Sequence, residues 1–403
     1  MIKKTRLLSR LVFPLALTLG FATGLSEFEP LMGLASAVSQ VFINLLKLIS
    51  LPIIFLSIVS TLANMQGIDE LRSLGRLVLK YTLLTTVLAA TIALALFVTL
   101  KPAAAGMFLN LPANPMPLMD HSAGYLHYFM QMIPSNILQP FHEGNVIAVL
   151  LLAVGLGMAI ISLPEEKRSV LQSFFSSLYA ATMKATSFIV QGMPIAIWAF
   201  IALFVQDLKN GLSIQTLAVY LICIVLANLI QALIVLPLLL KLKGIPPFKT
   251  AKAMLPALVI AFWSKSSSGA LPVALKCAQE RLKLSSKVSN FSLPLCTTIN
   301  MNACAAFILI TVLFVSMVNG AIFSMGDYVM WIFISTLAAV GNAGVPMGCY
   351  FLASALLASM DVPVHLLGVI LPFYALLDML ESAINVWSDA CVTAIVDQDF
   401  KNS

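Results

Sequence analysis

Apolar runs of about 20 residues follow one another along almost the whole chain, and they constrain its fold more than any other feature. A run of that length is enough for a helix to cross the hydrocarbon core of a bilayer. Of the 403 residues, 60% are hydrophobic and only 10% are charged, whereas a soluble globular chain carries roughly 25% charged residues. The composition therefore predicts an all-α polytopic membrane protein. The first six predicted spans lie near residues 10–32, 37–63, 76–100, 144–163, 180–206 and 214–241.

The chain has a net charge of +6, and most of its Lys and Arg residues lie in the connections between these spans rather than in one patch. Lys3, Lys4 and Arg6 precede the first span, and the next connection carries Glu27 and Glu29 without a basic residue. Basic-rich and basic-poor connections continue to alternate, which indicates a cytoplasmic N-terminus and gives no reason to expect a nucleic-acid partner. The first run resembles a signal peptide, but no clear small-residue cleavage site follows it, so we expect an uncleaved transmembrane helix.

Cysteine and histidine spacing predicts no disulfide framework and no dedicated metal site. The chain has no C-x-x-C pair, and its histidines show no H-E-x-x-H or similar spacing, so free thiols are expected. The residues concerned are Cys223, Cys277, Cys296, Cys304, Cys349 and Cys391, with His121, His127, His142 and His365.

The regular succession of spans breaks twice in the second half of the chain. Residues 250–262 are apolar, but a polar cluster at 264–269 interrupts them, and both flanks are basic. Residues 329–341 and 348–359 are likewise separated by a Gly/Pro-containing break, and their flanks carry no cation. Two interrupted helical hairpins that enter from opposite faces are typical of an inverted-repeat secondary transporter with a midplane site. The alternative is two ordinary transmembrane helices broken by Gly and Pro.

Polar side chains line one face of the last predicted helix. Asp378, Glu381, Asn385 and Asp389 are spaced by three, four and four residues, so they share a helix face. Charged groups at membrane depth are costly and usually mark a solute or ion site. Asp378 is a candidate for a substrate ammonium, Asn385 for a carboxylate and Asp389 for a monovalent cation. The alternative is an internal polar network with Lys265.

A further polar cluster interrupts the seventh predicted span, near residues 287–315. Asn300 and Asn302 place two amides within otherwise apolar sequence. An unwound segment that offers carbonyl oxygens to an ion is one interpretation, and helix packing through small polar residues is the other.

Four motifs, in order, resemble those of the glutamate transporter homologues, the dicarboxylate/amino acid:cation symporter family. Residues 266–272 resemble the S-S-S-G-T-L-P tip of the first hairpin, 300–304 resemble the N-M-D-G-T motif, 343–346 match the second hairpin tip and 378–389 match the final helix. The resemblance implies a homotrimeric elevator-type transporter with eight transmembrane helices and two re-entrant hairpins. The implied division is scaffold helices 1–2 at 1–75, transport-domain helix 3 with an extracellular loop at 76–143, scaffold helices 4–5 at 144–213 and the remaining transport domain at 214–403.

The resemblance also implies site residues by position. Asp378 matches the residue that binds the substrate ammonium, and Asn385 matches the one that binds its α-carboxylate. The other implied substrate contacts are Ser266, Ser267, Cys304, Val345, Cys349 and Glu381. The implied sodium ligands are Cys296, Asn300, Asn385 and Asp389 at one site, Thr298, Met301, Ala339, Val340 and Asn342 at a second, and Asn302 with Thr85 and Thr86 at a third.

Departures from the family pattern bear on the substrate and the ions. Members that carry acidic substrates have an arginine where this chain has Glu381, and Cys304 replaces a threonine that touches the substrate side chain. We therefore predict a neutral or cationic amino acid as the substrate. Protonation of Glu381, or its pairing with Lys265, would leave a glutamate/aspartate or C4-dicarboxylate symporter as the alternative. Asn302 replaces an aspartate and Thr82 a tyrosine at the third sodium site, which predicts fewer sodium ions or a proton carried on Glu381.

The sequence thus predicts a secondary-active sodium-coupled symporter of the bacterial inner membrane, with both termini cytoplasmic and the lipid bilayer as its surroundings. It is not expected to be an enzyme or to need a cofactor, and sodium is the only metal ion expected. A Ser-Lys membrane protease would need the adjacent Lys265 and Ser266 in suitable geometry, which neighbours rarely achieve. An ion channel would need continuous polarity along a pore, whereas polarity here is concentrated near one depth.

Overall fold

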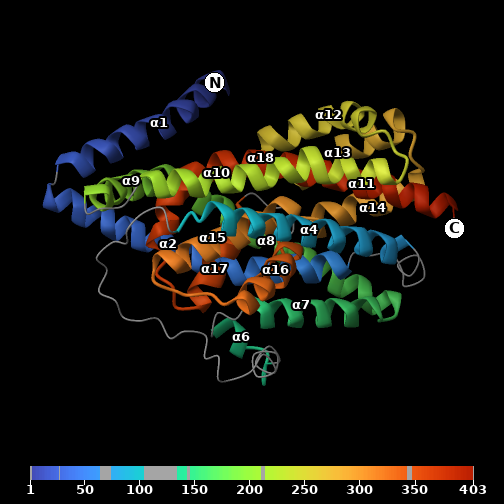
Figure 1. The fold of residues 1–403 in the computed structure, drawn as a ribbon. Helices are drawn as coiled ribbons and strands as arrows, with labels where there is room; N and C mark the ends of the chain where they lie inside the picture. Colours follow the sequence, from blue (N-terminus) through green and yellow to red (C-terminus); the bar gives the residue numbers. More distant parts are fainter. Residues whose placement is uncertain are drawn as a thin grey trace.

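The described part of the chain is built from helices and contains no strands. The computed structural model describes residues 2–26, 28–63, 74–103, 134–142, 146–209, 214–342 and 347–402. Most helices run roughly along one direction (Figure 1). The helices of the first half are α1 (Ile2–Ser26), α2 (Glu29–Ala63), α4 (Arg76–Leu100), α6 (Gln139–His142), α7 (Val146–Ile161), α8 (Glu165–Gln191) and α9 (Met193–Lys209). Those of the second half are α10 (Ile214–Ile230), α11 (Leu236–Leu242), α12 (Pro247–Ser264), α13 (Ser267–Lys276), α14 (Ser286–Ile299), α15 (Asn302–Val318), α16 (Met325–Val340), α17 (Gly348–Ser359) and α18 (His365–Asn402), with π-helical turns η2 (Gln231–Val235) and η3 (Cys277–Arg281).

Four described helical segments are long and apolar enough to cross a membrane. They are Arg76–Leu100, Ile214–Leu242, Ser286–Val318 and Leu366–Lys401, and shorter apolar helices accompany them. The predicted helical, apolar architecture is confirmed, whereas the number of eight spans stays a prediction.

Two of the predicted span boundaries are wrong. The span expected at 10–32 covers a break, because α1 ends at Ser26 and α2 begins at Glu29. The span expected at 180–206 is divided at Gly192, where α8 ends and α9 begins. Pro30 and Pro194 each follow the first residue of the new helix, where a proline costs no intrahelical hydrogen bond. Glu27, Glu29 and Pro30 mark the first break in the sequence, and Gly192 and Pro194 mark the second. Each was included in a predicted span because apolar residues follow closely on both sides.

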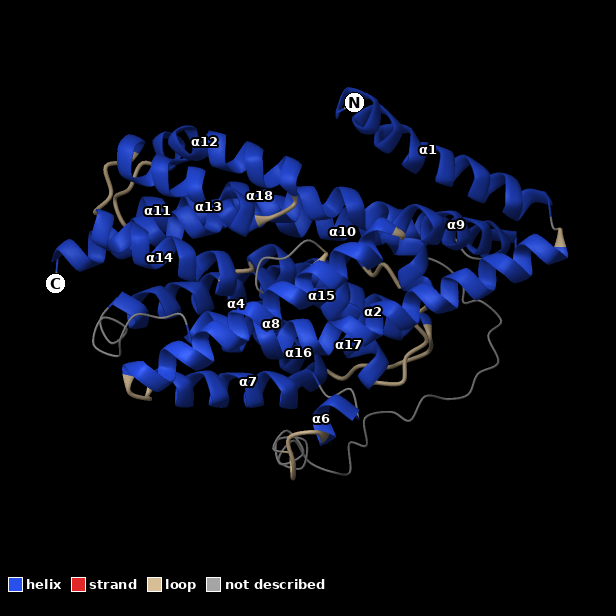
Figure 2. Ribbon diagram, turned by 180° about the vertical axis from the view of Figure 1, so that it is seen from behind, coloured by secondary structure: helices blue, strands red, loops and turns tan. Residues whose placement is uncertain are grey.

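The first predicted hairpin is formed by α12 and α13. The two helices pack against each other and against α18, and both of their outer ends lie at the end of the bundle that holds the C-terminus (Figures 1 and 2). Lys265 makes the reversal with a left-handed backbone (φ 55°), and the Ser266 hydroxyl caps α13 by accepting from the Gly269 N–H at 3.0 Å. A serine cap of this kind satisfies one of the unpaired donors at a helix start.

The second hairpin corresponds to α16 and α17, which both pack against α15. Its helices end and begin where the sequence predicted the interruption, at Val340 and Gly348. The tip residues 343–346 lie outside the described residues. Met347, just before α17, also has a left-handed backbone (φ 63°), a conformation that costs a side-chain-bearing residue of order 1 kcal/mol or more.

The helices fall into two groups by their packing. One group, in which the helices pack against one another, consists of α1, α2, α7, α8 and α9; the other consists of α4 and α10–α18. The groups meet where α9 contacts α18, where α2 contacts α17, and where α7 contacts α16 and α17. At the first of these contacts, Gly368 lets the Phe200 ring approach so closely that a Cβ there would lie 2.1 Å from it.

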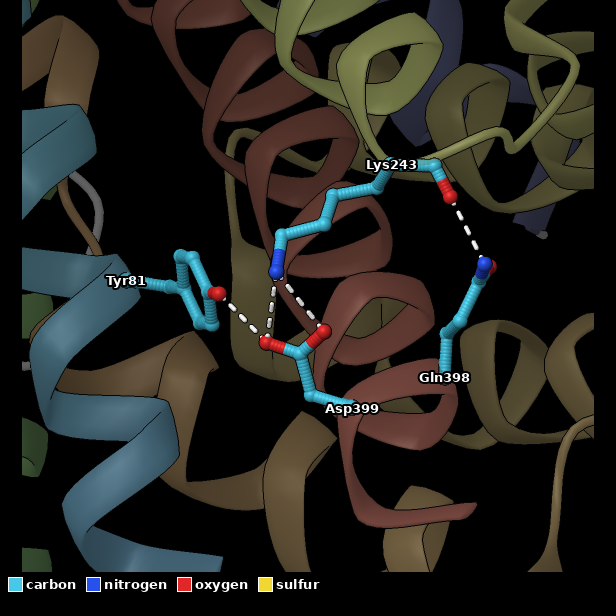
Figure 3. A network of polar contacts seen from close by, with 4 residues as sticks. All are labelled: Tyr81, Lys243, Gln398 and Asp399. Atoms are coloured by element: carbon cyan, nitrogen blue, oxygen red, sulfur yellow. Dashed lines mark hydrogen bonds and ion pairs between the residues drawn. The ribbon is translucent and has the colours of Figure 1, made fainter. Parts of the chain in front are cut away.

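A polar clasp ties three elements of the second group together at one end (Figure 3). Asp399 of α18 accepts from the Lys243 ammonium at 2.7 and 2.8 Å, and also from the Tyr81 hydroxyl of α4. Gln398 donates to the Lys243 carbonyl oxygen at 2.7 Å. The hydrogen bonds that Lys243 donates to Asp399 raise the pKa of the Lys243 ammonium, so this ammonium is charged at neutral pH.

Glycines at the contact between α1 and α9 give a test of helix packing. A Cβ on Gly20 would lie 2.7 Å from the Ile201 Cβ, and one on Gly24 would lie 2.5 Å from the Val205 Cβ. Small residues four apart allow close helix approach in membranes. We expect Gly20→Ala and Gly24→Ala each to destabilise the protein by about 1–3 kcal/mol through overpacking, measured as a lower thermal midpoint in detergent. Gly33→Ala is the matched control, since a Cβ there has nothing within 4 Å; equal stability of all three variants would contradict the packing.

Candidate functional site

The polar face of α18 is buried in the middle of the second group of helices. Asp378, Glu381 and Asn385 are 4%, 1% and 3% exposed. The Tyr374 hydroxyl lies 3.4 Å from an oxygen of Asp378 and 3.4 Å from one of Glu381. A phenol has one proton to donate, so Tyr374 can serve only one of the two carboxylates at a time. The face is therefore short of donors.

Two other chain breaks bring backbone groups to this face. Between α14 and α15, Asn300 and Met301 leave the helical conformation (φ, ψ of −96°, 69° and −106°, 63°). This break agrees with the unwound segment predicted there, and just after it the Ala303 N–H donates to the Asn385 Oδ1 at 3.0 Å. At the second hairpin, the Met347 N–H donates to Asp378 at 3.3 Å.

A small cavity of about 10 Å³, about the space that one water molecule needs, lies between these elements. It is lined by Ser267, Met301, Cys304, Asn342, Cys349, Asp378, Glu381, Ser382 and Asn385. Six residues predicted to contact the substrate are thus brought together from α13, α15, α17 and α18. Ser266 lies next to this lining as the cap of α13, and Val345 lies outside the described residues.

A second polar cluster lies one to two turns further along α18, around Asp389. Asn300 donates to Asp389 Oδ1 at 3.0 Å and to the Ser388 hydroxyl at 2.9 Å, while Asn302 donates to Ser388 at 2.6 Å. The Asn302 oxygen accepts from Thr86 at 2.8 Å and lies 3.3 Å from the Thr85 hydroxyl. The second oxygen of Asp389 is buried without a hydrogen-bond partner. A buried carboxylate with a free oxygen is the kind of group that a cation stabilises.

The remaining predicted sodium ligands are distributed around these two clusters. The Cys296 carbonyl accepts from the Asn300 N–H at 2.8 Å, so it lies at the chain break. Ala339 is buried at the end of α16, and its carbonyl accepts from the Asn342 N–H at 3.0 Å. Met301 and Asn342 both line the cavity, whereas the Thr298 hydroxyl donates to the Pro294 carbonyl one turn back at 3.2 Å.

Lys265 does not form the pair with Glu381 that the sequence left open. One Glu381 oxygen faces the Tyr374 hydroxyl, and the other, Oε1, is buried without a hydrogen-bond partner. Lys265 makes the turn of the first hairpin, and its charge acts on Asp378. The part of the chain that the structure describes therefore shows no internal ion pair that neutralises Glu381.

The expectation of free thiols is wrong for two of the six cysteines. Cys304 of α15 and Cys349 of α17 form a disulfide, with their Cα atoms 5.3 Å apart, while the other four cysteines are free and buried. Their separation of 45 residues gives no local spacing signal, and only the packing of α17 against α15 brings them together. The Asn342 amide donates to both sulfurs, at 2.9 and 3.4 Å.

Ser388 and Met347 are parts of the site that the sequence did not identify. Ser388 follows Asn385 by three residues and therefore falls on the same face of α18, a signal that could have found it. Met347 contributes through its backbone N–H, and a backbone contact leaves no signal in residue type.

Comparison with known proteins gives one family and several transporters. The model of the Sodium:dicarboxylate symporter family matches residues 8–399. The Neutral amino acid transporter B(0) of Bos taurus is 27% identical over 402 residues, covering 92% of this chain and 74% of the bovine protein. The Excitatory amino acid transporter 3 of Mus musculus is 26% identical, with coverage of 89% and 78%. A putative sodium-dependent excitatory amino acid transporter of Caenorhabditis elegans is 32% identical over 63% of this chain and 51% of its own length.

Ser388 allows a direct test of the Asp389 cluster. Ser388→Ala removes the acceptor of the Asn302 amide and one acceptor of Asn300, so we expect a loss of about 1–3 kcal/mol from buried donors without partners. Ser316→Ala is the matched control, because its hydroxyl is fully buried and has no partner to lose. Thermal midpoints of the purified variants check the prediction; equal midpoints would show that the Ser388 hydrogen bonds contribute nothing.

Proposed function

Because its match to the family model extends over residues 8–399, the chain belongs to the sodium:dicarboxylate symporter family, and we propose that it imports a neutral or cationic amino acid together with sodium. Its relatives are neutral and excitatory amino acid transporters. Family and apolar helices together make it an integral membrane protein whose coupling ion is sodium.

One observation carries the choice of substrate: Glu381 lies in the cavity beside Asp378, and one of its oxygens has no partner. Members of the family that carry acidic substrates resemble this chain elsewhere but have an arginine at this position. A second carboxylate here repels the side chain of aspartate or glutamate, and it attracts an ammonium or guanidinium group. If Glu381 is protonated during transport, the same position suits a neutral polar side chain.

The rest of the cavity supports recognition of the amino-acid backbone. Asp378 offers a carboxylate to the substrate ammonium. The Asn385 oxygen accepts from the Ala303 N–H, and its amide nitrogen donates a long hydrogen bond of 3.7 Å to the Cys304 sulfur in the wall of the cavity. That nitrogen is therefore available to a carboxylate. Ser267, buried at the start of α13, adds a hydroxyl.

The cluster at Asp389 supports one sodium site, with oxygens of Asp389 and of the carbonyls at the α14–α15 break. The third family site lacks its formal charge, because Asn302 is neutral and its oxygen and nitrogen already bond Thr86 and Ser388. A neutral, internally bonded amide holds a monovalent cation less well than a carboxylate does. We therefore infer that fewer sodium ions are coupled than the three sites of the family pattern would allow.

The proposal includes two properties that the family resemblance implies, namely that the protein is a homotrimer and that it transports by an elevator mechanism. The two packing groups support a proposed division into a scaffold (1–75 and 144–213) and a transport domain (76–143 and 214–403). The clasp among Tyr81, Lys243 and Asp399 supports movement of α4, α11 and α18 as one unit. Bacterial inner-membrane placement with cytoplasmic termini remains the proposal drawn from the charge pattern.

Substrate competition tests the proposal. In proteoliposomes with an inward sodium gradient, we expect serine, glutamine, lysine or arginine to compete for uptake better than aspartate. Glu381→Arg should raise the preference for aspartate over serine by at least about tenfold, since a guanidinium fork binds a carboxylate. Glu381→Gln is the matched control for charge loss alone. Better competition by aspartate in the unmodified protein would favour the acidic-substrate alternative instead.

Sodium titration tests the ion count. Asn302→Asp restores a negative charge beside Thr86, so we expect it to steepen the sodium dependence of uptake. If the added ion contact contributes about 1.4 kcal/mol, the affinity for sodium should rise about tenfold. Asn319→Asp, at the far end of α15, is the matched control. A Hill coefficient near three in the unmodified protein would refute the reduced ion count.

A further inference from the structure

Three potential metal ligands from three helices converge on the wall of the cavity. One donor atom each from Cys304 of α15, Cys349 of α17 and Glu381 of α18 lie within 4.8 Å of one another. All three residues are at least 98% buried. Cys304 and Cys349 are among the predicted substrate contacts and line the cavity, but the proposed recognition of sodium and of the amino-acid backbone needs no thiolate from either.

Two buried polar atoms beside the sulfurs have unused bonding capacity. Glu381 Oε1 and Asn342 Oδ1 are buried and lack hydrogen-bond partners among the residues that the structure describes, which leave out 343–346. The Asn342 amide nitrogen donates to both sulfurs, and hydrogen bonds of this kind orient and support ligands around a metal. A buried carboxylate oxygen without a partner, beside two sulfurs, is suited to a cation.

The donor set selects the class of cation. Thiolates prefer zinc and other thiophilic metals, whereas sodium, magnesium and calcium prefer oxygen. Zinc commonly takes three protein ligands and leaves its fourth position open to water or another molecule. Zn–S bonds of about 2.3 Å in a tetrahedron place two sulfurs about 3.8 Å apart, which a Cα separation of 5.3 Å permits once the sulfur–sulfur bond is broken.

We propose that the reduced Cys304 and Cys349, together with Glu381, form a binding site for a thiophilic divalent cation such as Zn²⁺ or Cd²⁺. The two thiols each release a proton as the metal binds and no electrons are transferred, so two thiols and one M²⁺ become a dithiolate complex and two H⁺. The disulfide is the closed form of the site, since bonded sulfurs are not thiolate ligands. Opening it takes two electrons and two protons from a reductant such as a dithiol or a phosphine, which is oxidised in turn. The proposal adds a second kind of metal ion to sodium.

A consequence for transport rests on the proposed function. The metal would lie within the cavity that is proposed to take the amino acid, and it would engage Glu381. Metal and amino acid should therefore exclude each other, and reduction of the disulfide should make uptake sensitive to the metal.

Cadmium titration of the full-length protein in detergent tests the site. The protein is reduced with a phosphine, the reductant is removed, and Cd²⁺ is added while the ultraviolet charge-transfer band of Cd–thiolate bonds is recorded. We expect one saturable Cd²⁺ per chain in the reduced protein and none in the oxidised protein. Cys304→Ser, Cys349→Ser and Glu381→Gln should each weaken binding by at least about tenfold, whereas Cys223→Ser, at a buried free cysteine outside the trio, should leave it unchanged.

The comparison of reduced with oxidised unmodified protein needs no variant, so a misfolded mutant cannot obscure the result. An equal band in both redox states, or a band that survives loss of both Cys304 and Cys349, would overturn the proposal. Serine competition is measured separately. Cd²⁺ binding without any amino-acid binding would uphold the metal site and refute the proposed function, and amino-acid binding without Cd²⁺ binding would do the reverse.

Discussion

Asp378, Glu381 and Asp389 place three carboxylates on one side of α18, each buried within a membrane protein. Moving an ionised carboxylate out of water costs several kcal/mol even after the protein relaxes, and three near one another also repel. The described residues supply a few hydrogen bonds and leave one oxygen of Glu381 and one of Asp389 without a partner. The face is therefore incomplete as a purely structural network. It becomes stable through cations from outside, or through protons.

The surrounding architecture delivers backbone groups to this face where regular helices would keep them occupied. The chain leaves the helical conformation at Asn300 and Met301, turns at Lys265, and starts α17 at Met347. Two of these breaks use non-glycine residues in the left-handed region, which is a local cost that the packing of α12–α13 and α15–α17 must offset. Irregular backbone at membrane depth is tolerated where it is buried in protein or lines a cavity, and here it does both.

The sequence predicted the features that depend on residue type and short spacing. The helical class and the two interruptions follow from apolar runs and polar clusters, and the shared face of Asp378 and Asn385 follows from helix periodicity. Ser267 was expected near them only from the family resemblance. The breaks near Ser26 and Gly192 were included in predicted spans because apolar residues flank them closely, although Glu27, Glu29 and Gly192 mark them in the sequence. The disulfide was missed because it depends on how α15 and α17 pack, and the clasp at Asp399 because Tyr81 and Lys243 are distant from it in the chain. Contacts of this kind are properties of the fold, not of a local pattern.

The buried carboxylates of α18 have too few positive charges near them, which makes their burial unfavourable. Under the proposed function, the same shortage explains how binding of the ion and of the substrate are coupled. Asp378 and Asp389 lie about three helical turns apart on one helix, and the Asn300–Met301 break, with Ala303 bonded to Asn385, connects the two clusters. A sodium ion that orders this break also positions Asn385 for a substrate carboxylate, so each ligand lowers the cost of binding the other. Such coupling is reciprocal by thermodynamic necessity. Glu381 has no partner in this scheme, because the backbone of an amino acid carries one ammonium group and Asp378 binds it. A cationic side chain, a proton, or a thiophilic metal held with the neighbouring sulfurs can each satisfy it, and the choice among these three sets what the cavity accepts.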